Sequence, residues 1–302
     1  MTTPAQIRQT TVADKARLLK RTAMASVATA SVLIVVKFVA WLMTGSVSIL
    51  ASLVDSLMDS MASLINLLAV RWSLQPADAE HRFGHGKAEP LAGLVQAAFI
   101  SGSAVFLVLH AIDRLRHPGP LEAVGIGIGI MVFSIVMTLG LLFVQRRTIR
   151  ATASTAIRAD ALHYASDLLT NIGIIVALAL AGQGWQRVDP IIAIGIAVYI
   201  FASALRIGYE ALQQLMDREL PMDIQQKILN AARSQPAVLG VHDLRTRQSG
   251  QTRFVQLHLE LDADLPLAQA HAIADQVDAA IKALLPDAEI IIHQDPVEVR
   301  HS

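Results

Sequence analysis

The feature that most constrains this chain is a series of six long apolar stretches within its first 205 residues. A helix needs about 20 mostly apolar residues to cross the hydrocarbon core of a bilayer, and each stretch approaches or meets that length. The composition agrees, because 53% of the residues are hydrophobic and only 17% are charged. We therefore predict a six-helix transmembrane bundle, with helices at residues 22–44, 46–70, 91–112, 124–144, 161–181 and 188–205.

Charge and cysteine content exclude several classes of function. The formal net charge is zero and the pI is about 7.2, so the chain lacks the basic field that nucleic-acid binding requires. We expect no nucleic-acid partner. The chain contains no cysteine, which excludes disulfides, thiolate metal sites and cysteine nucleophiles. Histidine, aspartate and glutamate remain as the strong metal ligands.

Lysine and arginine residues near the helix ends predict how the bundle lies in the membrane. Such residues collect on the cytoplasmic side of membrane proteins. If the N-terminus is cytoplasmic, only Arg114, Arg116 and Arg187 fall on the outer side. The polar segment 1–21 shows no secretory signal pattern, so the first apolar stretch is interpreted as a membrane helix. We predict a multi-pass inner-membrane protein with both termini in the cytoplasm.

The composition changes from about residue 216 to that of a soluble domain. Residues 221–234 and 267–285 have helical periodicity, whereas residues 252–261 alternate between polar and apolar side chains, as a half-buried strand does. With strands at 238–247 and 288–293, the order is α-β-β-α-β, which predicts a small α+β domain with helices on one face of a sheet. The predicted domains are a segment 1–21, a membrane domain 22–215 and a cytoplasmic domain 216–302.

Four residues inside two predicted membrane helices have the spacing of a metal site. Asp55 and Asp59 are four residues apart in the second stretch, and His163 and Asp167 are four apart in the fifth. Residues at positions i and i+4 share one face of a helix, so each pair points one way. The two helices are antiparallel in the predicted topology, and both pairs fall near the middle of the membrane. Four ligands can therefore converge.

The cost of burying acids indicates what these residues bind. One carboxylate at the bilayer centre costs at least ~2.5 kcal/mol, unless a cation or a proton neutralises it. Three carboxylates and one imidazole suit a tetrahedral ion such as Zn²⁺, and they also accept Fe²⁺ or Cd²⁺. The alternative is that the acids are protonated and hold the helices together, or relay protons alone.

The same charges predict a mechanism. Metal ligands bind in deprotonated form, so an arriving dication displaces protons from an empty site. This linkage is the physical basis of metal/proton antiport. His163 is the best candidate proton carrier, because histidine has a reference pKa near neutrality. Asp160, one turn before His163, is expected to be a solvated carboxylate at the membrane interface.

Two further groups of residues have ligand chemistry but do not decide a site by themselves. Asp78, His81 and His85 lie in the polar loop after the second stretch, with spacings of three and four. They suit a second metal ion, although histidines in a polar loop are often simply solvated. In the tail, imidazoles from separate elements gather around one ion only if the fold brings them together. The tail residues are His242, His258, His271, His293 and Asp295.

Several segments together make the chain resemble the cation diffusion facilitators. They include VDSLMDS, HYASD, SLQPADAEHRFGHGKAE, LMDRELP, VHDLRTRQSG, QLHLELD, QAHAIADQVD and IIHQDP. The resemblance implies a metallochaperone-like cytoplasmic domain and a homodimer that exports Zn²⁺ in exchange for protons. It implies that Asp55, Asp59, His163 and Asp167 form the transport site, and it matches Lys87 and Asp217 to a charged pair at the dimer contact.

The resemblance also resolves the two undecided groups. It implies a loop site at Asp78, His81 and His85. It implies a binuclear site at the tail dimer interface, with Gln294 beside it and the five tail residues named above as ligands.

The predicted function is divalent metal efflux by proton antiport, with a tail that senses metal and stabilises the dimer. Zn²⁺ is the expected cargo, and Fe²⁺ and Cd²⁺ are further candidates. A metal-gated channel without proton coupling is one alternative. An intramembrane metallohydrolase is another, but it needs a general base and an open coordination position, and the chain has no HExxH motif. We therefore expect a transporter and not an enzyme.

Overall fold

A computed structural model describes residues 12–45, 47–116, 125–181 and 188–298. The chain divides into two compact units, Met1–Leu212 and Gln213–Ser302, which are described separately.

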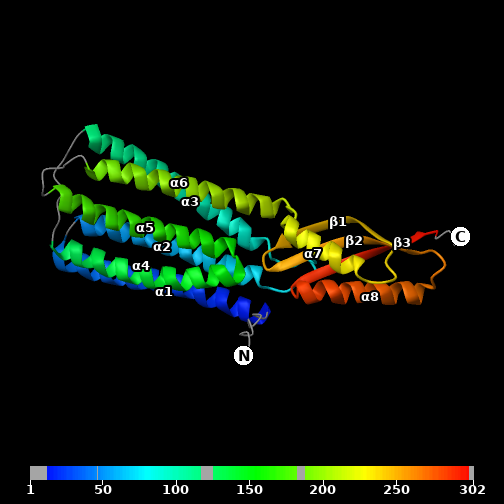
Figure 1. Ribbon diagram of the computed structural model, residues 1–302. Coiled ribbons are helices and arrows are strands. Elements are labelled where there is room, and N and C mark those ends of the chain that lie inside the picture. The colour runs from blue at the N-terminus through cyan, green and yellow to red at the C-terminus, as the bar shows by residue number, and fades with distance from the viewer. Residues whose placement is uncertain (1–11, 46, 117–124, 182–187, 299–302) are drawn as a thin grey trace, which may run out of the picture. The chain divides into compact units, whose positions relative to one another are not determined.

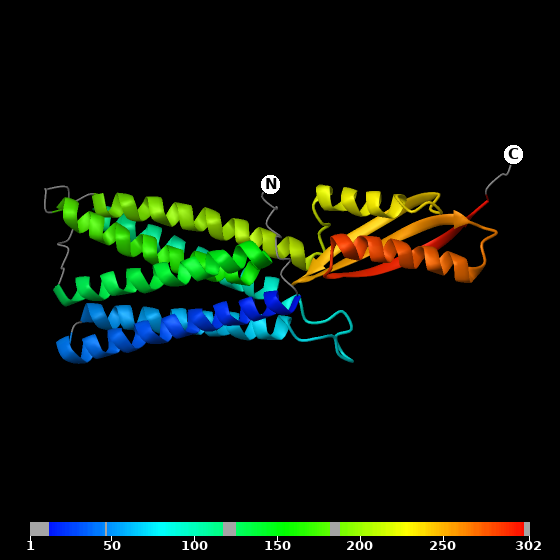
Figure 2. The ribbon, with the colours of Figure 1, turned by 60° about the horizontal axis from the view of Figure 1, so that its bottom comes forward.

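Six long helices build the first unit and run alongside one another as a bundle (Figures 1 and 2). The shortest have 27 residues and the longest has 33. At about 1.5 Å per residue, even the shortest exceeds the ~30 Å hydrocarbon core, so the helices extend beyond the apolar stretches that predicted them. Their bounds are α1 Val12–Thr44, α2 Val47–Ser73, α3 Ala88–Arg116, α4 Gly125–Thr152, α5 Thr155–Ala181 and α6 Val188–Leu215.

Five of these helices contain a stretch that is long and apolar enough to cross a membrane, as judged within the described residues. They are α1, α2, α3, α4 and α6. The first half of α5 carries the charged or ionisable residues Arg158, Asp160, His163 and Asp167, two of which are candidate ligands.

A tight turn joins α1 to α2. Gly45 has a φ of 61°, a left-handed conformation that glycine adopts without steric cost, and its N–H donates to the Trp41 carbonyl over 2.8 Å. The chain reverses here, so α2 packs antiparallel to α1 and carries its acids back into the bundle.

The second unit has the element order predicted from the sequence. It consists of α7 Met222–Arg233, β1 Gly240–Ser249, β2 Thr252–Asp262, α8 Leu267–Leu284 and β3 Ala288–Val297. The sheet order is β1-β2-β3, with β1 antiparallel and β3 parallel to the central β2. The parallel pairing requires a crossover, and α8 provides it.

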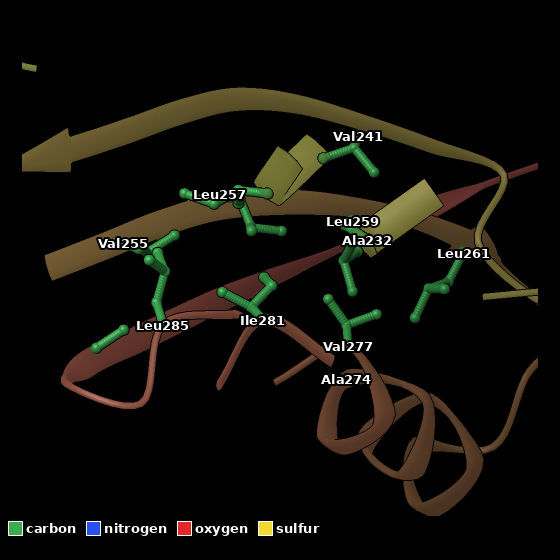
Figure 3. Packing of buried hydrophobic residues seen from close by; sticks show 12 residues of the cluster. Ala232, Val241, Val255, Leu257, Leu259, Leu261, Ala274, Val277, Ile281 and Leu285 are labelled. Carbon is green, nitrogen blue, oxygen red and sulfur yellow. The ribbon is translucent and has the colours of Figure 1, made fainter. Parts of the chain in front are cut away.

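Alternation along β2 decides which face of the sheet is covered. Val255, Leu257 and Leu259 are fully or almost fully buried, whereas Gln256 between them is exposed. The buried side chains pack against Ala232 of α7 and against α8, as Figure 3 shows. This confirms the predicted face, and it leaves His258 on the face of the sheet that the two helices do not cover.

The last strand is longer than predicted. It runs to Val297, past Pro296, where the sequence analysis ended it near His293. Proline cannot donate to a ladder but is tolerated on an edge strand, and β3 is at the edge of this sheet. The extension places Asp295 inside a regular strand, opposite Glu260.

Candidate metal centres

The first candidate centre lies between α2 and α5. His163 Nε2 is 2.9 Å from Asp59 Oδ1 and 3.9 Å from Asp167 Oδ2. Ligand atoms of Asp59, His163 and Asp167 all lie within 4.8 Å of one another. Two carboxylates and an imidazole at this separation can bind one dication. Asp55 belongs to α2, but its side chain lies outside the described residues, so its part in this centre stays a prediction.

Neighbouring side chains fix the orientation of α5 at this centre. Tyr164 is almost fully buried, and its hydroxyl is 2.9 Å from Ser63 Oγ of α2 and 3.1 Å from the Ser26 carbonyl of α1. The Tyr164 ring also meets the His163 imidazole edge to face, with centroids 5.8 Å apart. These contacts tie the ligand-bearing turn of α5 to both neighbouring helices.

Asp160 was predicted to be a solvated carboxylate at the membrane interface. The structure contradicts this prediction, because Asp160 is completely buried. Ser26 Oγ donates to it over 2.6 Å and Gln145 Nε2 over 2.8 Å, and Gln96 Nε2 lies 3.4 Å away. The three donors come from α1, α4 and α3. Sequence analysis missed this network because its members lie on four separate helices, and no local pattern connects them.

A cavity of about 760 Å³ opens beside the centre, and Asp59 and Asp167 line it. Its other polar lining includes Lys37 and Ser52, which lie near the end of the bundle where α1 turns into α2. The opposite end is packed by apolar side chains of α1, α2 and α5, including Leu19, which is fully buried. The cavity beside the centre therefore extends toward the α1–α2 turn.

The second candidate centre is the loop between α2 and α3, which Figure 2 shows in cyan. Asp78 is 3.4 Å from His81 Nδ1 and 3.3 Å from His85 Nε2, and the two rings lie 4.5 Å apart. The His81 backbone N–H donates to Asp78 over 2.6 Å, and this bond is the main reason that the Asp78 pKa lies below its ordinary value. Nδ1 of His85 is buried without a hydrogen-bond partner. The three side chains form a compact ligand group.

The third candidate centre is on the uncovered face of the tail sheet. His258 pairs with His242 across β1 and with His293 across β3, so three imidazoles lie in one row. Asp295 lies close to all of them: its oxygens are 2.8 Å from His258, 3.3 Å from His242 and 3.2 Å from His293. The hydrogen bond from His258 is the largest cause that lowers the Asp295 pKa. The predicted tail ligands on the three strands are therefore brought together.

His271 is the exception among the predicted tail ligands. It lies on α8, its side chain is 70% exposed, and its charged neighbour is Asp275, at 3.7 Å. It belongs to none of the ligand groups that the described residues of one chain form.

Comparison with known proteins agrees with the division of the chain. Residues 23–216 match the cation efflux transmembrane domain, and residues 220–297 match the cytoplasmic domain of cation efflux proteins. The chain belongs to the cation-efflux family. It is a multi-pass membrane transporter of cations, and an intramembrane hydrolase is set aside.

Relatives within the family are similar over nearly their whole length. The cation-efflux pump FieF of Klebsiella pneumoniae and that of Salmonella agona are each 56% identical to this chain over 283 residues, 94% of both chains. A solved structure of CzrB in its Zn form is 30% identical and covers 26% of this chain and 92% of its own, with a TM-score of 0.26. The family assignment rests on the other comparisons.

Two acids beside the tail centre of this cation-efflux protein were missed from the sequence. Glu260 Oε1 lies 3.0 Å from His242 Nδ1, and its period-two spacing from His258 could have predicted it. Asp243 Oδ2 lies 3.7 Å from His258 Nε2, where the β1–β2 register shifts between His242 and Arg245. A bulge of this kind has no local signal, so Asp243 could not have been found.

Proposed function

We propose that this transporter exports Zn²⁺ from the cytoplasm in exchange for protons, with Fe²⁺ or Cd²⁺ as alternative cargo. The observation that carries the proposal is the meeting of Asp59, His163 and Asp167 within 4.8 Å, on two facing helices of an apolar bundle. A nitrogen and carboxylate oxygens suit a borderline dication, and α2 also offers Asp55 as the fourth ligand.

Charge supports the exchange of the dication for protons. Three ionised carboxylates give the empty site a charge of −3, which an apolar surrounding tolerates poorly. A dication reduces this charge, and protons do the same when the dication has left. His163 is the proposed carrier of one of these protons, because an imidazole has a reference pKa near neutrality. The open cavity beside the site corresponds to the state that releases metal, if the α1–α2 turn faces away from the cytoplasm.

Membrane placement completes the proposal. All six long helices span the inner membrane, with α5 shielded among its neighbours, and both termini lie in the cytoplasm as the basic residues predict. The proposed domains are a segment 1–21, a membrane domain 22–215 and a metallochaperone-like cytoplasmic domain 216–302.

The loop and tail centres are proposed to bind further metal ions. Asp78, His81 and His85 hold one ion, and the tail centre responds to cytosolic metal. The chain acts as a homodimer, and Lys87 and Asp217 take part in the dimer contact. His271 then meets a tail centre only when a second copy is present, which explains its separation from His258 within one chain.

Reconstituted flux tests this function. Purified protein in proteoliposomes should move Zn²⁺ against its gradient when a pH gradient is imposed. A channel would instead follow only the zinc gradient and the membrane potential, and zinc movement that ignores the pH gradient would therefore refute antiport. Repeating the assay with Fe²⁺ and Cd²⁺ ranks the three ions by their rates of transport.

A further inference from the structure

Lys37 is the one charged residue in the apolar stretch 22–44, and its half-buried side chain lines the cavity beside the first candidate centre. A lysine within a membrane span is costly and is commonly found where function requires it. Its side chain does not extend toward the end of α1. Its ammonium donates to Ser56 Oγ over 2.6 Å and to the Ser52 carbonyl over 3.1 Å, so it is held against α2.

The surface of α2 that holds Lys37 also carries a candidate metal ligand. Ser52, Ser56 and Asp59 follow one another at spacings of four and three, which places them on one helix face. Lys37, Asp59 and Asp167 line the same cavity. The lysine is therefore a fixed positive charge in the space through which an ion would leave the site.

The charge balance shows what this ammonium does. The three carboxylates of the proposed transport site carry −3, and Lys37 brings the total to −2. A dication then makes the whole group neutral. Without Lys37, the same dication would remain in a site with one excess negative charge, where it would be held more strongly.

We propose that Lys37 is a release-promoting residue: its positive charge weakens the hold of the transport site on the metal ion, so that the ion can leave through the cavity. The inference rests on the proposed transport site. Hydrogen bonding between α1 and α2 is the competing role, and it would need a donor but no charge.

Substitutions that separate charge from hydrogen bonding test the proposal in proteoliposomes. Lys37→Gln keeps a donor and removes the charge, and we expect it to lower the KM for Zn²⁺ by about tenfold and to reduce the maximal transport rate. Lys37→Arg keeps the charge and should behave like the unmodified protein. Ser31→Ala removes an exposed hydroxyl on the same helix and serves as the control. If Lys37→Gln does not fold, Lys37→Asn, which also keeps a donor and removes the charge, tests the same expectation.

The outcomes separate this inference from the transport site itself. An unchanged or higher KM in the uncharged variants would overturn the role of Lys37, provided that Asp167→Asn abolishes flux. If Asp167→Asn transports normally, the transport site is misassigned and both proposals fail.

Discussion

His163 lies 2.9 Å from Asp59, although 104 residues separate the two in the chain. The contact joins α5 to α2, and Asp167 joins the group from the next turn of α5. Because two helices supply the ligands, any motion of one helix against the other changes the geometry offered to an ion. A transport site between helices can therefore be coupled to a change of conformation.

Asp167→Ala should abolish metal-coupled proton flux, because it removes one ligand and one negative charge from the site. The tail should still bind metal, since its ligands belong to the other unit. Flux and metal content of the purified variant provide the measurement. Asp223→Ala, at an exposed surface pair with Lys227, is the matched control and should transport normally. Normal flux in Asp167→Ala would refute the site.

Asp160→Ala should destabilise the bundle by about 1–3 kcal/mol, because Ser26 and Gln145 would lose a buried acceptor. Thermal unfolding in detergent measures the loss. Asp160→Asn keeps one acceptor oxygen and should be affected less. Equal stability of Asp160→Ala and the unmodified protein would show that the network contributes nothing to the fold.

His258→Ala should remove most of the stabilisation that Zn²⁺ gives to the tail. His258 is the middle imidazole of the row and contacts Asp295 directly, so its loss divides the ligand group. The unfolding temperature of the full chain with and without Zn²⁺ measures the effect. Lys227→Ala on the exposed surface of α7 should leave the zinc-induced shift unchanged. A full shift in His258→Ala would contradict the tail centre.

Zinc binding at the tail should weaken at acid pH, because an imidazole binds a metal ion only in its deprotonated form. Asp295 should not contribute to this loss, because its pKa is lowered and its carboxylate stays ionised while the imidazoles take up protons. Calorimetric titration at two pH values of a variant that carries both Asp167→Ala and Asp78→Ala measures the tail without the transport and loop sites. Affinity that is independent of pH would show that imidazoles are not the ligands.

Features that repeat along the chain could be predicted, and features that depend on packing could not. The alternation of β2 predicted its buried face, and the spacing of His163 and Asp167 predicted that both would face α2. The complete burial of Asp160 depends on donors from three other helices. Likewise, the position of Lys37 in the cavity follows from the pairing of α1 with α2, which a single apolar stretch does not reveal.

Helix and strand ends were predicted least well, for two physical reasons. Apolar stretches mark the hydrocarbon core, whereas backbone hydrogen bonding in α1 continues through polar residues to Val12. The last strand was predicted to end at residue 293, shortly before Pro296, but the missing N–H of that proline is harmless at an edge. The position of Glu260 beside the tail centre could have been predicted from the sequence, but it was overlooked.

The row of histidines across β1, β2 and β3 has a mechanical consequence. Backbone ladders join the three strands at that level, and α7 and α8 cover only the opposite face of the sheet. An ion bound to the row would cross-link the three strands on the face of the sheet that the helices do not cover. The edge strands β1 and β3 should then be cut more slowly by a protease when the row holds a metal ion.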